Sequence, residues 1–97
     1  MNLDELRAEH AKACIIEQCA ADPKAAKAAS DKADRLNRRI RQKEAFLRMQ
    51  GFLDAAKSAE EYEDAKAAYI RFEDARLDWL RISHELLDAG LKALASA

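Results

Sequence analysis

Long stretches without helix-breaking residues are the feature that most constrains this fold. The 97 residues include only one Pro and two Gly. Ala is the commonest residue and the strongest helix former, because it loses no side-chain entropy on folding. With 36% charged and 49% apolar residues, the composition is typical of a helical protein with a single core. We therefore predict an all-α fold in one domain, residues 1–97.

Capping residues predict where the first two helices begin. Asn2, with a Glu three residues later, forms a capping box that predicts a helix over about residues 3–20. The sequence ADP at 21–23 supplies an Asp as N-cap and a Pro at the first helical position. The second helix is therefore predicted over about 23–50, or to 56 if it passes through Gly51.

The third helix is predicted from a second capping box. Ser58 opens the sequence SAEE, which predicts a helix over about 59–89, or to 95 if it passes through Gly90. A short connection makes consecutive helices antiparallel neighbours. The expected architecture is three helices, namely a long antiparallel helical hairpin and a shorter N-terminal helix, completed by oligomerisation.

A basic stretch, RLNRRIRQKEAFLR, occupies residues 35–48. Its arginines spread over about half of the helix circumference, opposite an apolar stripe that ends with Leu36, Ile40 and Leu47. This scatter favours a solvated face that is ion-paired with acidic residues of the third helix, over an anionic protein partner or nucleic acid. A net charge of -1 also argues against a nucleic-acid binder. The candidate anion-facing residues are Arg35, Arg38, Arg39, Arg41 and Arg48.

Apolar residues near the end of the second helix lie opposite its apolar stripe. A helix that is apolar on two faces needs a further helix, a second copy or a foreign partner. The first helix, roughly 27 Å long, is too short to cover this end of the hairpin. We therefore expect self-association, most simply as a two-fold dimer. The predicted association surface comprises Phe46, Met49, Phe52 and Leu53, together with Ile15 and Cys19 on a second apolar face of the first helix.

The third helix carries an apolar arc about 200° wide, which suits contacts with two neighbours. Leu87, Leu91 and Leu94 continue one stripe of this arc across Gly90. Tyr62, Tyr69, Phe72 and Trp79 follow helical spacing and are interpreted as core residues, with a base-stacking platform as the alternative.

Three charged residues are predicted to form one polar layer of the hairpin. Arg76 falls within the apolar arc, Glu73 precedes it by one turn, and Lys43 lies at a similar height on the second helix. A buried charge must be paired, so we interpret the set as an ionic layer that sets the register. A site for an anionic ligand or for proton transfer is the alternative.

Metal and cofactor sites are not expected. His10 and Cys14 share a helix face and would need His84 or a carboxylate to complete a zinc site, which is a weak signal. Cys14 and Cys19 lack the spacing of a zinc or redox motif and are predicted to be reduced. No nucleophile motif and no glycine-rich phosphate loop occurs in the sequence.

The opening LDELRAE, residues 3–9, resembles the first turn of helical chorismate mutases. That family consists of small all-helical dimers whose active site is built from arginines and a lysine, so the resemblance implies a small helical enzyme. In this chain ADP at 21–23 interrupts the long helix of the family, and no residue is assigned a catalytic role. The interpretation as an enzyme therefore ranks third.

We expect a non-catalytic protein-interaction module that self-associates and binds a protein partner. Small Ala-rich chains of this kind act as adaptors, assembly factors or inhibitors, including those encoded by bacteriophages. A helical nucleic-acid binder that uses residues 35–48 is the alternative. No apolar run approaches the roughly 18 residues of a membrane span, and no signal peptide is recognisable, so a cytoplasmic location is expected.

Overall fold

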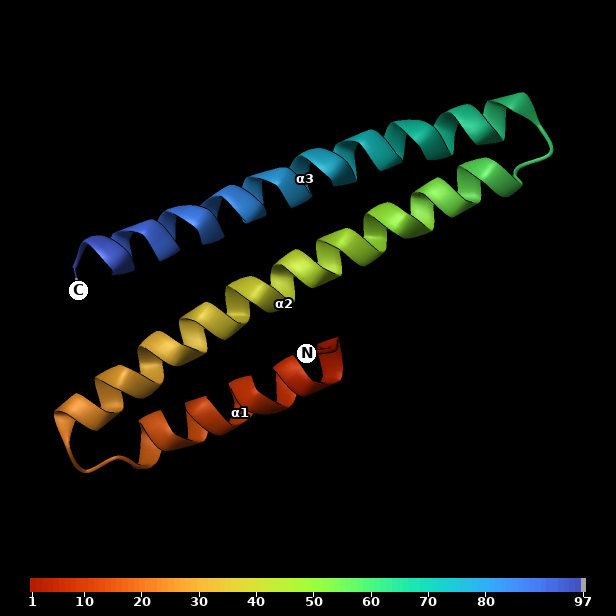
Figure 1. Cartoon of the computed structure of the whole chain (residues 1–97). Helices are drawn as coiled ribbons and strands as arrows, with labels where there is room; N and C mark the ends of the chain where they lie inside the picture. Colours follow the sequence, from red (N-terminus) through yellow and green to blue (C-terminus); the bar gives the residue numbers. More distant parts are fainter. Residues whose placement is uncertain (97) are drawn as a thin grey trace. The chain divides into compact units, whose positions relative to one another are not determined.

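A computed structural model of the chain describes residues 1–96, and this part is helical with no strand (Figure 1). The helices are α1 (Leu3–Cys19), α2 (Pro23–Ser58) and α3 (Tyr62–Ala95). The predicted all-α class with three helices is confirmed. α2 continues through Gly51 and α3 through Gly90. Within the described part, no helix combines the length and the apolar character needed to cross a membrane.

Local capping contacts explain where α1 and α2 begin. The Asn2 side-chain oxygen accepts a hydrogen bond from the backbone N–H of Glu5 at 2.8 Å, which satisfies one of the free donors of the first turn. The Asp22 carboxylate accepts from the backbone N–H of Lys24 at 3.1 Å in the same way. Pro23 takes the first helical position, where it loses no hydrogen bond.

The predicted capping box at Ser58 is wrong. Ser58 is the last residue of α2, and its hydroxyl donates to the carbonyl oxygen of Asp54 at 2.9 Å. The hydroxyl therefore bonds back to a carbonyl of the preceding turn of α2 and caps no helix start. α3 begins at Tyr62, after Glu61, which makes no capping hydrogen bond through its side chain.

The chain divides into two compact units, which meet between Arg41 and Gln42 within α2. In the N-terminal unit, α1 lies antiparallel to the first part of α2 (Figure 1). An ion pair between Glu9 and Lys32, at 3.8 Å, joins the two helices at the edge of their contact. The core of this unit consists of Leu6, Ala13, Ala33, Leu36 and Ile40, with Leu3 and Cys14 packed against it.

The C-terminal unit is an antiparallel hairpin of the second part of α2 and α3 (Figure 1). The rings of Phe46 and Trp79 lie 6.2 Å apart, centroid to centroid, and join the two helices. One turn away along α2, the Gln42 amide donates to the Ser83 hydroxyl at 2.9 Å. α3 faces α2 through residues that alternate in spacing by three and four, which we call its inner seam: Ala65, Ala68, Phe72, Ala75, Trp79 and Ile82.

The spacing of the buried residues of α2 breaks between its two halves. In the first half, residues 26, 29, 33, 36 and 40 are buried or half-buried, and in the second half residues 42, 45, 49, 52 and 56 are. Continuing the first row beyond Ile40 leads to Leu47, which is 50% exposed. The predicted burial of Leu47 is therefore wrong. The row has shifted by two residues, which correspond to roughly 200° on a helix, so the extrapolated stripe lands on the solvent side.

Gly51 gives a direct test of the continuous α2. It lies in the helix interior, and a Cβ atom added to it would meet no atom within 4 Å. We therefore expect Gly51→Ala to raise the free energy of unfolding by about 0.5–1 kcal/mol, because Ala loses less backbone entropy in a helix. Chemical denaturation followed by circular dichroism measures this change.

The control for this test is Gly51→Pro, which removes a helical hydrogen bond and should destabilise the protein by about 3 kcal/mol or more. If Gly51→Ala were destabilising and Gly51→Pro tolerated, α2 would be interrupted at this residue in solution.

Candidate protein-binding surface

Packing of α2 in the hairpin with α3 buries part of the association surface that was predicted on α2. Met49 is only 8% exposed, so the prediction that it lies uncovered on the surface is wrong. Phe46 retains 39% exposure while its ring packs against Trp79 of α3. Phe52 and Leu53 are half-buried. The two-residue shift in the buried row of α2 explains the error, because it turns these residues toward the hairpin.

The N-terminal unit exposes the part of the predicted surface that belongs to α1. Ile15 and its neighbour Ile16 are exposed, as is Cys19 near the end of the helix. Ala13, on the other side of α1, is buried in the core of this unit. α1 therefore has one packed face and one open apolar face, as the sequence predicts. A role of the open face in association stays a prediction.

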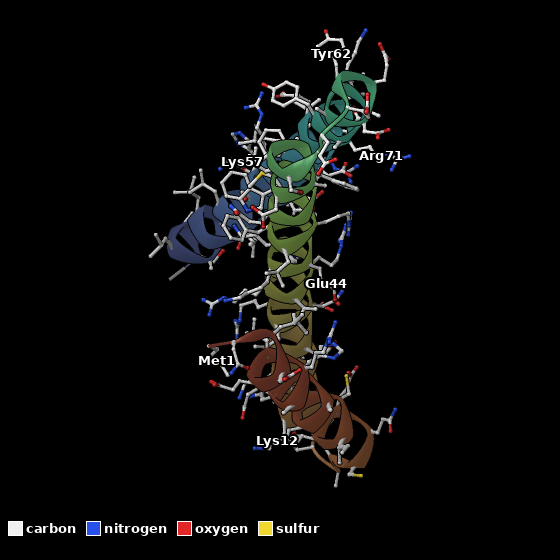
Figure 2. All side chains as sticks on the ribbon, turned by 90° about the vertical axis from the view of Figure 1, so that its right-hand side faces the viewer. Met1, Lys12, Glu44, Lys57, Tyr62 and Arg71 are labelled. Atoms are coloured by element: carbon white, nitrogen blue, oxygen red, sulfur yellow. The ribbon has the colours of Figure 1, made fainter. Side chains whose placement is uncertain are left out.

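A shallow groove at the turn of the C-terminal hairpin was not predicted. It measures about 410 Å³, and its lining is mostly apolar, with two lysine side chains. Lys57 and Tyr62 lie on the two sides of this turn, and the Tyr62 ring extends outward (Figure 2). Only the hairpin brings these residues together, from both sides of the turn. The lining residues are Leu53, Ala56, Lys57, Tyr62, Ala65, Lys66 and Tyr69.

The longest open apolar surface of the C-terminal unit runs along α3. Up to Leu87, each of its positions follows an inner-seam position by five residues, which places it roughly 140° around the helix. Its residues again alternate in spacing by three and four, and Leu77 and Leu94 are 59% and 74% exposed. We call this row the outer seam: Ile70, Leu77, Leu80, Leu87, Leu91 and Leu94, with Glu73 and His84 at its polar positions. The wide apolar arc predicted for the third helix thus separates into two seams.

The residues of the predicted polar layer are not buried. Glu73 and Arg76 form an ion pair within α3, with 3.0 Å between the guanidinium Nη2 and the carboxylate Oε2, and both side chains are partly exposed. Lys43 is exposed on α2. No polar or charged residue is buried in the part of the chain that the structure describes. A joint layer that includes Lys43 stays a prediction.

The arginines of the basic stretch lie at the surface. Arg35, Arg39, Arg41 and Arg48 are exposed, and Arg38 is half-buried. The acidic residues of α3 that were expected to pair with them include Glu73 and Asp78. These two form ion pairs with Arg76 and Arg81 of α3 itself, the second at 3.7 Å. Pairs of this kind between exposed side chains contribute about 0–1 kcal/mol each.

Residues with metal-ligand chemistry meet only in pairs. The Cys14 sulfur lies 3.8 Å from the Nε2 atom of His10, one turn earlier on α1. Both cysteines are free thiols. Among residues 1–96, no group of three or more His, Cys, Asp or Glu side chains is arranged to hold a metal ion.

Truncation of a buried residue and of an exposed residue of α2 should change the free energy of unfolding by different amounts. Met49→Ala should lower the free energy of unfolding by about 2–5 kcal/mol, because it leaves a cavity in the hairpin. Leu47→Ala, at an exposed position two residues earlier, should change it by less than about 1 kcal/mol. Urea denaturation of both variants checks the position of the buried row. Equal losses would mean that α2 packs through another face.

No protein-family model, curated protein or solved structure matches the chain. The features that bear on its function are therefore its own exposed surfaces. These are the outer seam of α3, the groove at the turn, the open face of α1 and the arginines of α2. The outer seam is the longest apolar surface among them.

Proposed function

We propose that this chain is a non-catalytic protein-interaction module of the cytoplasm, which self-associates and acts as an adaptor, assembly factor or inhibitor by binding a protein partner. The observation that carries this proposal is the outer seam of α3. Apolar residues spaced by three and four over about three and a half heptads are typical of a helix that packs against another helix. In this chain five of the six apolar residues of such a row are exposed to solvent, and Leu80 is half-buried.

The distribution of apolar side chains supports the same proposal. Half of the buried residues are alanines, whereas leucines such as Leu77, Leu87 and Leu91 are each more than half exposed. Single exposed leucines are common on protein surfaces, but several exposed apolar residues along one helix face mark an interaction site. A helix from a partner protein would cover this row by ordinary helix packing.

A capture experiment with substitutions in the outer seam tests this function. Leu77→Gln with Leu91→Gln makes the seam polar without a change of charge and retains good helix formers. We expect the tagged wild-type chain to retain a specific protein from nuclease-treated extract, and this double variant to lose it. Mass spectrometry identifies the retained protein, which is either another chain or an untagged copy of this one.

The matched control is Leu47→Gln, which changes a leucine of similar exposure on α2. It should bind as the wild type does. Retention that is unchanged in the seam variant, or equally lost in the control, would contradict binding through the outer seam.

Nucleic-acid binding through the basic stretch is the second candidate, because four of its five arginines are exposed. Their spread around α2 and the net charge of -1 favour it less. We expect DNA or RNA to bind weakly at most at about 150 mM salt, with affinity that falls as salt rises. Fluorescence anisotropy measures this. Sub-micromolar binding that Arg38→Glu with Arg41→Glu abolishes would reverse the ranking of the two functions.

A further inference from the structure

The outer seam of α3 is self-complementary when two copies of α3 are placed antiparallel. In an antiparallel helix pair, each seam residue of one helix meets a seam residue of the other, and each such pair forms one layer. Charged residues that flank the seam on the same side of the helix face each other across the pair. One alignment pairs Leu77 with the partner's Leu94, and Leu80 with the partner's Leu91. The same alignment pairs His84 with the partner's Leu87, and symmetry repeats each layer. Four of the six layers are then leucine against leucine.

Flanking charges favour this alignment. It places Arg81 beside the partner's Asp88 twice, once on each side of the two-fold axis. Arg81 reaches Asp78 of its own helix only at 3.7 Å, and its side chain is 66% exposed. A second acidic partner is therefore accessible to its guanidinium group.

Other arrangements bring like charges together. If one α3 helix is shifted along the other by one heptad, Arg81 lies beside the partner's Arg81, and Asp74 lies beside the partner's Asp88. A parallel pair places Arg76 beside the partner's Arg81. Like charges at these positions disfavour an arrangement, so charge selects among pairings that the leucines alone would allow.

A shift by two heptads also pairs opposite charges but uses the seam less well. It places Glu73 in a seam layer, although the Glu73 carboxylate already accepts hydrogen bonds from Arg76 at 3.0 and 3.2 Å. It also leaves Leu91 and Leu94 without an apolar layer partner. Burial of the ion pair of Glu73 costs desolvation energy, whereas burial of exposed leucines is favourable. The shifted alignment is disfavoured on both counts.

We infer that the occupant of the outer seam is a second copy of this chain, paired antiparallel over Leu77 to Leu94 with Arg81 facing the partner's Asp88. The inference rests on the proposed function and names the partner of that surface. The overlap covers about 18 residues of each α3, or roughly 27 Å. It leaves the inner seam, and hence the hairpin, in place.

Sedimentation equilibrium of the purified chain tests the inference without any other protein. The wild type should form a dimer of the 10.9 kDa chain that dissociates on dilution. Leu77→Gln with Leu91→Gln should raise the dissociation constant at least roughly 100-fold, because each of the four leucine–leucine layers of the dimer then contains a glutamine. Helicity by circular dichroism should stay unchanged in this variant.

The control is Leu47→Gln with Ile70→Gln, which changes two apolar residues of similar exposure. Ile70 belongs to the outer seam but lies outside the overlap, so this variant should dimerise as the wild type does. A loss of dimer in the control would overturn the alignment, because Ile70 has no layer partner in it but has one in the alignments shifted by one or two heptads.

Charge reversal identifies the facing residues. Arg81→Asp and Asp88→Arg should each weaken the dimer roughly tenfold, because each brings two pairs of like charges together. The two substitutions combined should restore it. Restoration through Asp74→Arg instead of Asp88→Arg would overturn the alignment.

A wild-type chain that stays monomeric at about 200 µM, well above the dissociation constants of stable dimers, would overturn the inference of a second copy. The proposed function would still be supported if the capture experiment retained a foreign protein through the same seam. Failure of both experiments would overturn the proposed function as well.

Discussion

The fold depends on α2 packing through a different row of residues in each of its halves. Ala33, Leu36 and Ile40 contribute to the core with α1, whereas Ala45 and Met49 are buried in the hairpin with α3. Both rows alternate in spacing by three and four, but the second is displaced by two residues from the continuation of the first. One helix can in this way take part in two cores, and each unit needs only one further helix to complete it.

Both cores are thin because small residues line them. Alanines make up five of the ten buried apolar residues, and no large side chain of the described part is fully buried. Small residues let helices approach closely, but hydrophobic stabilisation scales with the apolar area removed from water. A chain of 97 residues also buries a smaller fraction of its surface than a larger domain does. Cover for the exposed leucines of α3 would therefore add to stability as well as to binding.

The two seams of α3 separate folding from binding. Its inner seam holds the hairpin through contacts such as Phe46 with Trp79. Its outer seam lies roughly 140° away, so a partner helix can pack on it without displacing α2. The ion pairs of Glu73 with Arg76 and of Asp78 with Arg81 lie within α3 and leave the hairpin contacts untouched. In the proposed dimer, the charges that flank the outer seam then choose the orientation of the partner.

The sequence alone determined the number of helices and the starts of the first two, because capping and helix breaking act between residues a few positions apart. Asn2, Asp22 and Pro23 show this directly. The same local reasoning failed at Ser58, whose hydroxyl has two possible roles and serves the end of α2. It also failed for Leu47 and Met49, whose burial depends on which helix lies beside them. Only the tertiary structure decided the shift in the buried row of α2 and the division of the apolar arc of α3 into two seams. The reason is that hydrophobic periodicity shows which residues share a face, but not which of two apolar faces meets a neighbouring helix.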